Sequence, residues 1–360
     1  MDFGIFNLMT LRDPSKSRRE IIDETLSLVQ LAEAIGIDIA WFAEHHFSNY
    51  SISPSPLMMA SWMAAKTTRI KVGPAVIVLP LYHPMRMAQE VALLDIQSGG
   101  RAVVGIGSGY QAYEFERFGA RLDTKAEVML EYWDVLEQML GRGHVDFHGK
   151  HFAAPPTDFA LRPLQKSLAP FYVTGSSPAI LRRVVETGSV MFMTAGWRGS
   201  AGLLGMYEQM KEQCRQLGLG DQIPATGIQQ YIHVTDDKEQ ALKAADCARY
   251  VGRLVTSLRK PKTEVDGFSI REEVFDGEPP LETFRDNLII GDAHHVAQRM
   301  AKEIRAMRPI HYNCFFQFGA LPVELARSSM VRFAKDVLPL LEQEVGPLDR
   351  IGKEALPKVA

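Results

Sequence analysis

Cysteine is scarce in this chain, and its distribution excludes two kinds of protein. Three cysteines occur among the 360 residues, Cys214, Cys247 and Cys314, and none lies close to another in sequence. Being so few and so widely spaced, they form neither a disulfide framework nor a zinc-binding motif. We therefore expect a protein of a reducing compartment that holds no metal.

The sequence also lacks a long apolar run and a strong excess of charge. No stretch approaches the roughly 20 apolar residues that span a bilayer, and the formal net charge is −3. Such a chain gives no sign of binding nucleic acid or a membrane surface. The N-terminal residues do not form a basic region followed by an apolar one, so we expect no signal peptide. These absences predict a cytoplasmic protein.

What the sequence does contain is an alternation of short apolar strands with amphipathic helices. About eight such repeats favour a closed parallel barrel over an open doubly wound sheet, which is the alternative. We predict one α/β domain, a (β/α)8 TIM-type barrel with insertions, over residues 1–345. A polar insertion or lid is expected near residues 259–283, and a loosely held tail over 346–360. The predicted strands cover residues 3–9, 37–43, 70–79, 102–106, 171–174, 190–194, 226–234 and 311–316.

One stretch brings chemistry to the end of a predicted strand. Residues 40–47 begin as an apolar run and end in Glu44, His45 and His46. A buried barrel strand delivers catalytic side chains from its carboxyl tip in this way. The alternative is that all three are polar loop residues with satisfied hydrogen bonds.

Four stretches, taken together, resemble the bacterial luciferase-like family of flavin-dependent monooxygenases. Their order and spacing are similar to the family's over nearly the whole chain, from Met1 to about Glu342. They are Trp-Phe-Ala-Glu-His-His-Phe at 41–47, Val-Gly-Pro-Ala-Val-Ile-Val-Leu-Pro at 72–80 with His83-Pro84, Leu-Asp-Ile-Gln-Ser-Gly-Gly-Arg at 94–101 before Gly-Ile-Gly-Ser-Gly at 105–109, and Leu-Ile-Ile-Gly-Asp at 288–292.

The resemblance implies a (β/α)8 barrel that binds FMN, or in one branch the deazaflavin F420, at its carboxyl mouth. It implies a two-component monooxygenase, in which a separate flavin reductase supplies FMNH2. A flavin C4a-hydroperoxide would then insert one oxygen atom from O2 into a small, mainly apolar organic substrate such as an aldehyde or ketone. The alternatives are an F420-dependent oxidoreductase and a non-catalytic flavin-binding subunit.

A dinucleotide-binding fingerprint is missing from the chain. The glycines of residues 105–109 have the wrong spacing for it, so we expect no NAD(P)H site of the Rossmann type. This absence is consistent with an oxygenase that receives reduced flavin from a partner protein.

The resemblance also assigns roles to the residues after the second strand. His45 matches the family's catalytic base, and the chemistry needs a group that titrates near neutrality. Glu44 is expected to fix the tautomer of His45 or to shape the mouth. His46 is expected either to line the substrate pocket or to support the packing.

Three positions are expected to lie close to the flavin ring. The bond between Ala75 and Val76 falls where the family has a non-proline cis peptide beneath the ring, and a plain buried strand is the alternative. Gly107 stands where luciferase has a reactive cysteine, and we expect glycine to leave more space there. Tyr110 follows at the tip of the same strand.

The flavin phosphate is expected at two turns. Ser108 replaces an arginine that reaches the phosphate in luciferase, and Lys125 is next to the position of a second one, where it would act as a point charge. Thr174, Ser176 and Ser177 open a helix, whose backbone N–H groups and hydroxyls would bind an anion. Simple capping of that helix by Ser176 or Ser177 is the alternative.

Two apolar features complete the predictions. Met193 and Trp197 are candidates for the substrate pocket, although alternate residues of that strand also fit the barrel core. The helix predicted over residues 53–65 carries Met58 and Trp62, and such an apolar helix is either core or interface. Because the family dimerises through helices around the early units, we expect a homodimer.

Overall fold

The centre of the molecule is a ring of parallel strands, seen in a computed structural model that describes residues 1–353. The strands are hydrogen-bonded in the order β3-β2-β1-β14-β10-β9-β8-β5-β4. β3 (Lys71–Pro74) continues into β4 (Ile77–Val78) as one interrupted strand, and this closes a ring of eight positions. The predicted barrel is confirmed. The other strands of the ring are β1 (Asp2–Asn7), β2 (Ile39–Phe42), β5 (Gly105–Gly107), β8 (Tyr172–Thr174), β9 (Val190–Thr194), β10 (Ala225–Val234) and β14 (His311–Phe315).

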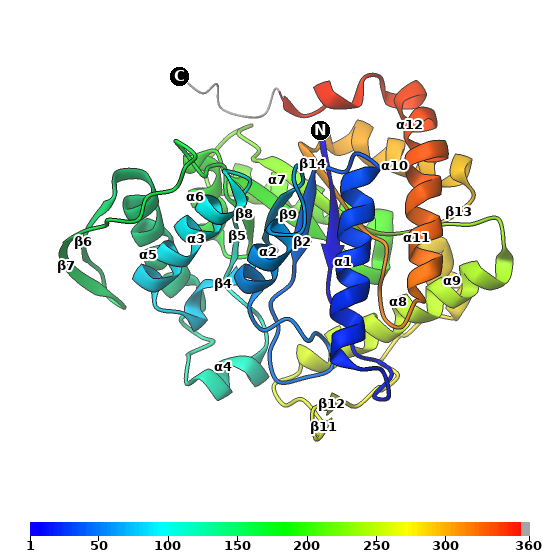
Figure 1. Cartoon of the computed structure of the whole chain (residues 1–360), viewed down its shortest axis with the longest axis horizontal. Coiled ribbons are helices and arrows are strands. Elements are labelled where there is room, and N and C mark those ends of the chain that lie inside the picture. Colours follow the sequence, from blue (N-terminus) through cyan, green and yellow to red (C-terminus); the bar gives the residue numbers. More distant parts are fainter. Residues whose placement is uncertain (354–360) are drawn as a thin grey trace.

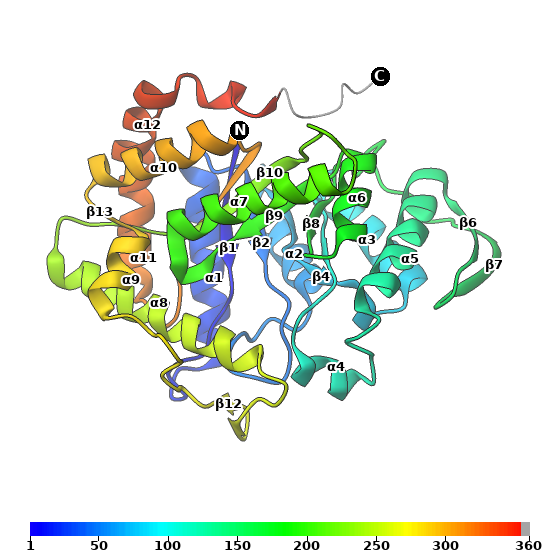
Figure 2. The same ribbon diagram turned by 180° about the vertical axis from the view of Figure 1, so that it is seen from behind.

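Helices surround the ring on its outer face (Figures 1 and 2). Local chemistry sets their ends: Ser17 and Glu20 form a capping box at the start of α1, and Gly99 ends α3 in the left-handed conformation. No helix in residues 1–353 is long and apolar enough to cross a membrane. The main helices are α1 (Arg18–Ala34), α2 (Pro56–Ala64), α3 (Pro84–Ser98), α5 (Lys125–Glu137), α6 (Pro178–Thr187), α7 (Gly199–Gln216), α8 (Lys238–Leu258), α10 (Ala293–Met307), α11 (Val323–Arg332) and α12 (Leu338–Val345).

Several connecting elements differ from the sequence prediction. α4 (Ala112–Phe118), α9 (Leu281–Asn287) and β13 (Ile289–Gly291) were not anticipated, and β13 adds to the far end of β10. Pro155 and Pro156 lie in β7 (Ala153–Asp158), which pairs only with β6 (His144–His148). An edge strand tolerates proline because it can leave N–H positions unpaired.

The polar insertion and the first part of the tail are both tied to the body of the protein. The insertion carries a small hairpin, β11 (Val265–Asp266) with β12 (Ser269–Ile270). Its main chain bonds to Asn49, which donates its N–H to Phe268 O and accepts from Ile270 N. In the tail, Ile351 is 4% exposed and Leu348 O accepts a hydrogen bond from the N-terminal amine. The first part of the tail therefore contacts the body of the protein, and residues 354–360 lie outside the described part.

The inside of the barrel is filled by aromatic side chains. Trp41 packs on Tyr172 and Phe192, with ring centroids 4.9 and 5.5 Å apart. Its indole N–H donates to Nε2 of His311 over 2.9 Å. Because these side chains fill the interior of the barrel, a ligand can bind only at the rim, where the loops lie.

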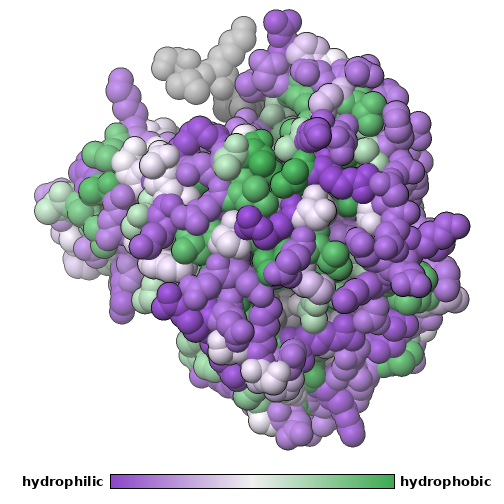
Figure 3. Space-filling model, turned by 45° about the vertical axis from the view of Figure 1, so that its right-hand side comes forward, coloured by the Kyte–Doolittle hydropathy of each residue, from purple (hydrophilic) through white to green (hydrophobic). Residues whose placement is uncertain are grey.

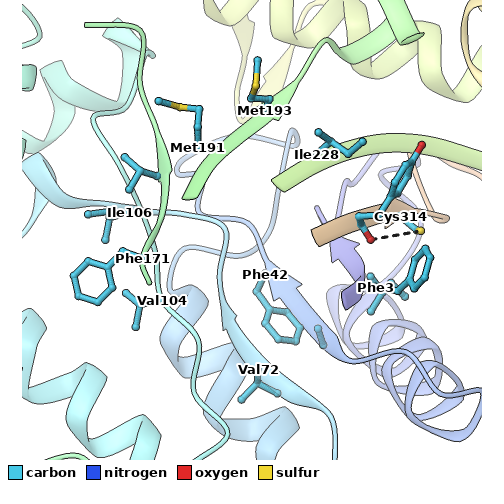
Figure 4. Close-up of a cluster of buried hydrophobic side chains, with 14 of the residues drawn as sticks. Phe3, Phe42, Val72, Val104, Ile106, Phe171, Met191, Met193, Ile228 and Cys314 are labelled. Atoms are coloured by element: carbon cyan, nitrogen blue, oxygen red, sulfur yellow. Dashed lines mark hydrogen bonds between the residues drawn. The ribbon is translucent and has the colours of Figure 1, made fainter. Parts of the chain in front are cut away.

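The outer face of the same strands belongs to a different core. Met191 and Met193 join a large apolar cluster between the barrel and its helices, together with Phe42 and Ile228 (Figure 4). Successive residues of a strand point to opposite faces, so Phe192 lies inside the barrel while its two neighbours lie outside.

Two buried histidines are held neutral by the fold. Burial lowers the pKa of His311 to about 3, and its Nε2 is already the acceptor for Trp41. Burial, helped by Arg332, lowers the pKa of His233 to about 4. Neither ring nitrogen of His233 has a hydrogen-bond partner among residues 1–353.

This arrangement predicts an acid-sensitive stability. Because an unfolded histidine titrates near pH 6.5, the unfolded chain binds more protons between pH 6.5 and about 4, and stability falls as the pH falls. Each histidine should remove about 2 kcal/mol at pH 5 relative to pH 7.5. Urea unfolding across this range should give a shallower slope for His233→Gln than for the wild type. Equal slopes would contradict the assignment.

Candidate active site

The loop after β2 places His45 at the carboxyl end of the barrel. Its side chain is 14% exposed. Nδ1 lies 2.8 Å from Nε2 of Gln111 and 3.2 Å from Oε1 of Glu114. Nδ1 is thus held between an amide and a carboxylate, while Nε2 has no hydrogen-bond partner among the described residues. Nε2 is the nitrogen available for proton transfer to a ligand.

Glu114 organises this loop, and it comes from the unanticipated helix α4. Its carboxylate is 2% exposed and accepts the backbone N–H of His46 over 2.7 Å as well as contacting His45. A buried carboxylate with these partners fixes both the ring and the backbone that carries it. The sequence around it offered no signal, because Glu114 and the exposed Glu116 occur in the same short run.

Glu44 does not orient His45, and this corrects the expected tautomer role. Its Oε1 contacts His46 Nε2 over 3.0 Å, and its Oε2 accepts the N–H of Val78 over 3.0 Å. Tyr82 also bonds to it, and burial raises the pKa of Glu44. The two acidic residues therefore serve different histidines: Glu44 joins His46 to the strand β4.

The peptide bond between Ala75 and Val76 is cis, as the resemblance implied. It lies where β3 gives way to β4, and Ala75 N–H donates to Phe42 O over 2.8 Å. The bond is therefore held beside the β2 loop, and Glu44 holds the N–H of Val78 just beyond it. The segment that carries His45 is therefore hydrogen-bonded to the interrupted strand on both sides of the cis bond, through Phe42 and Glu44.

Gly107 does not leave free space, contrary to the expectation. A Cβ built on it would lie 2.5 Å from Thr174 Oγ1 and 2.6 Å from Val76 Cγ2. The volume that a side chain would fill is taken by these two neighbours. Glycine is required here by close packing across the strands.

Gly107→Ala should therefore destabilise the protein by about 1–3 kcal/mol through overpacking. Gly205→Ala is the matched control, because a Cβ on that helical glycine meets nothing within 4 Å. The control should be stabilised by about 0.5–1 kcal/mol. Urea unfolding of both variants without cofactor measures the difference, and an unchanged midpoint for Gly107→Ala would contradict the packing argument.

The residues after β5 contact the site in an unexpected way. Ser108 is buried, and Lys125 donates from Nζ to Gly109 O over 2.8 Å, which anchors the β5–α4 loop. Burial lowers the pKa of Lys125. Tyr110 lies with its ring centroid 6.2 Å from that of His45 and accepts a hydrogen bond from Gln111 over 3.2 Å. Lys125 thus shapes the loop that carries Tyr110.

The turn after β8 keeps its hydroxyls uncommitted. Thr174 ends the strand, Ser176 is exposed and Ser177 is the N-cap of α6. Ser177 makes no side-chain capping bond, so the capping alternative is not what the structure shows. The hydroxyls remain available for an anion at this helix terminus.

The two apolar pocket candidates lie elsewhere. Met193 faces the outer core and not the mouth, because its strand position points away from the barrel axis. Trp197, in the short helix η3 (Gly196–Arg198), packs between Phe275 and Phe284 at 5.6 and 5.0 Å. The prediction of Met193 as a pocket residue is wrong, and Trp197 supports the packing beneath α8.

Two aromatic residues flank His45: Tyr110, which the sequence analysis placed at the site, and Tyr50, which it missed. Tyr50 packs against the imidazole at 4.5 Å and forms a hydrogen bond with Tyr110. Burial raises the pKa of Tyr110 to about 12, so its hydroxyl is neutral. On β1, Phe6 packs on Phe315 of β14, with ring centroids 5.0 Å apart. Nothing in the local sequence marks Tyr50, which reaches the site because its loop folds back over the mouth.

The rim of the barrel fits a flat heterocycle with a charged tail. Ala75, Val76 and Phe6 are only partly buried and offer a floor for a ring. Gln229 accepts from Asn313 through Oε1 over 2.9 Å, and its Nε2 has no partner among the described residues. A flavin needs such a flat apolar surface, an amide donor for its ring and a site for its phosphate. No cluster of metal ligands occurs in residues 1–353.

The fold and the rim together define an α/β-barrel enzyme that works from the carboxyl ends of its strands. Comparison with protein families gives the particular group: residues 1–308 match the model described as luciferase-like monooxygenase. The chain belongs to this family, as the four sequence stretches indicated. It is accordingly a flavin-dependent oxidoreductase of the monooxygenase class.

Two similar proteins match nearly the whole length of the chain. The uncharacterised protein y4vJ of Sinorhizobium fredii is 30% identical over 347 residues, covering 96% of this chain and 99% of its own. The oxygenase component of the flavin-dependent trigonelline monooxygenase of Acinetobacter baylyi is 26% identical over 352 residues, covering 95% and 96%.

Solved structures share the fold at low sequence identity. Monooxygenase RslO1 of Streptomyces bottropensis gives a TM-score of 0.80 at 20% identity, covering 94% of this chain and 99% of its own. The oxygenating constituent of 3,6-diketocamphane monooxygenase of Pseudomonas putida, in complex with FMN, gives 0.72 at 19%, covering 95% and 98%. The F420-dependent tetrahydromethanopterin reductase of Methanopyrus kandleri gives 0.67 at 19%, covering 94% and 98%.

Proposed function

We propose that the protein is the oxygenase of a two-component system, using FMNH2 and O2 to insert one oxygen atom into a small organic substrate. The observation that carries this is His45, whose Nδ1 is held by Gln111 and Glu114 and whose Nε2 has no hydrogen-bond partner among the described residues. The resemblance to the oxygenase component of trigonelline monooxygenase supports a separate flavin reductase as partner. A substrate of mainly apolar body suits the aromatic side chains around His45.

The residues of the chain divide the work. Ala75, Val76 and Gln229 would hold the flavin ring, and Ser176 and Ser177 its phosphate. Reduced FMN would supply the electrons that activate O2. His45 would hold or accept a proton at Nε2, while Glu114 and Gln111 keep its ring in place. The aromatic side chains would exclude water from the reacting atoms.

An F420-dependent oxidoreductase is the second candidate, since the Methanopyrus kandleri reductase has the same fold. Both cofactors bring a flat ring and a phosphate, so the residues at the rim do not separate them. The difference lies in O2, which only the monooxygenase consumes.

The test measures binding and oxygen use together. Purified protein is titrated with FMN and with F420, and then supplied with NADH, a flavin reductase and a library of small aldehydes, ketones and heteroaromatic compounds. We expect tighter binding of FMN and incorporation of one atom of ¹⁸O from ¹⁸O2 into a product. Binding of F420 alone, with hydride transfer and no labelled product, would overturn the proposal in favour of the second candidate.

A homodimer is part of the proposal. The packed pair α2 and α3 exposes large apolar side chains, Met58 at 73%, Leu93 at 42% and Ile96 at 36%. Hydrophobic residues also interrupt the polar surface of the face drawn in Figure 3. Exposed groups of this kind are typical of an interface. Light scattering coupled to size exclusion should give twice the mass of the chain, and a monomer would refute this part.

A further inference from the structure

Arg259, near the mouth, lacks the carboxylate partner that the neighbouring arginines have. In residues 249–271, Arg249, Arg253 and Arg271 each have an aspartate or glutamate oxygen within 4.0 Å. Arg259, at the end of α8, has no carboxylate within that distance among the described residues, and its side chain makes no hydrogen bond there. An exposed arginine left unpaired among so many acidic residues is available to a ligand.

The position of Arg259 ties it to the active site. Its guanidinium lies 5.7 Å from the centroid of the Tyr110 ring. Tyr110 in turn bonds to Tyr50 and to Gln111, and Gln111 contacts His45. α8 slants across the lower end of the barrel, where α4 and β12 also lie (Figures 1 and 2). The ring of Tyr110 therefore lies between the guanidinium of Arg259 and the imidazole of His45 in this series of contacts.

We propose that Arg259 binds an anionic group of the substrate, so that the substrate is a flat, ring-containing carboxylate. The ring would pack on the aromatic side chains around His45, and the carboxylate would take the two parallel N–H bonds of the guanidinium. This narrows the substrate class and rests on the function proposed above. The hydroxyls of Tyr50 and Tyr110 are neutral, so they do not favour a carboxylate ligand over the corresponding amide. The positive charge of Arg259 does favour the carboxylate.

The flavin phosphate is a poorer occupant of this position. The uncommitted hydroxyls of Ser176 and Ser177 lie at the start of α6, after β8, whereas Arg259 follows α8 and faces the loop after β5. A helix N-terminus suits a phosphate without any arginine. Arg259 is also the C-cap of α8. A positive charge stabilises the C-terminal end of a helix through the helix dipole, and a lysine would serve this purpose equally well.

The experiment compares acids with their neutral amides. Calorimetry on the FMN-loaded protein measures binding of benzoate, salicylate and nicotinate against benzamide, salicylamide and nicotinamide. We expect each acid to bind about tenfold or more tightly than its amide, with an affinity that falls as salt rises. Arg259→Gln should weaken the acids about 10- to 100-fold and leave the amides and FMN unchanged. Arg259→Lys should lie between, and Arg271→Gln, which alters an exposed arginine of the insertion, should have no effect.

The contrary results are distinct. Acids that bind no better than amides, or an Arg259→Gln variant that weakens both equally, would overturn the proposal. A loss of FMN affinity in Arg259→Gln would instead assign the arginine to the cofactor phosphate and overturn it too. If the wild type binds only F420, the function proposed above fails, but the same comparison on the F420-loaded protein still decides the role of Arg259.

Discussion

His45→Ala is expected to lower the rate of substrate oxygenation about 100- to 10,000-fold, the range for losing a general acid or base. The reason is geometric: Nε2 of His45 is the unpartnered nitrogen of a ring whose other nitrogen is held by Gln111 and Glu114. No other imidazole takes this place, since the ring of His46 is bound to Glu44. The measurement is kcat for labelled product under saturating FMNH2 and O2.

The affinity for FMN serves as the first control, because His45 is assigned to proton transfer and not to holding the flavin. His45→Ala should bind FMN within about threefold of the wild type, and added imidazole should restore part of the rate. His294→Ala alters an exposed histidine on α10 and should leave the rate unchanged. Wild-type turnover in His45→Ala would remove His45 from the mechanism.

Glu114→Ala is expected to have the second largest effect, and it should act on both stability and rate. Removing the carboxylate leaves the buried N–H of His46 without an acceptor, which costs about 1–3 kcal/mol. It also frees the His45 ring, and the lost orientation should lower kcat about 100-fold. Urea unfolding and product formation measure the two effects separately.

Glu114→Gln separates the charge of this residue from its shape. The amide still accepts the N–H of His46, so stability should change little. The contact 3.2 Å from Nδ1 of His45 becomes a neutral one, which holds the ring less firmly than a charge-assisted contact. We therefore expect kcat to fall about 10-fold while the unfolding midpoint stays in place. A purely structural role would leave kcat unchanged, and Glu116→Gln, on the exposed face of α4, should change neither quantity.

The active loop is built from parts far apart in the chain, and this explains what sequence reasoning reached. His45 and Glu114 are 69 residues apart, and they meet only because the loops after β2 and β5 gather at one end of the barrel. Glu44, the nearest acid in sequence, was the natural choice for orienting His45. A neighbour one residue away along an extended chain points elsewhere, and Glu44 accordingly turns to His46 and Val78.

A similar limit applies to the buried strands. Parallel strands covered on both faces are apolar throughout, so their sequence does not say which residues face the axis. Met193 and Phe192 look alike in this respect, yet only Phe192 lies inside the barrel. The sequence around Gly107 likewise does not show how much space lies beside it. The atoms that fill that space belong to Thr174 and Val76, which are distant from Gly107 in the sequence.

The sequence by itself determined the eight-fold alternation, the family, and the positions of His45 and of the cis bond between Ala75 and Val76. These depend on local order: strand length, turn residues and a motif at a strand tip are all contiguous. Only the tertiary structure decided the partners of His45, the packing at Gly107 and the approach of Arg259 to Tyr110. Those contacts arise from barrel closure, which brings the ends of separate strands to one rim and leaves no trace in any single stretch of residues.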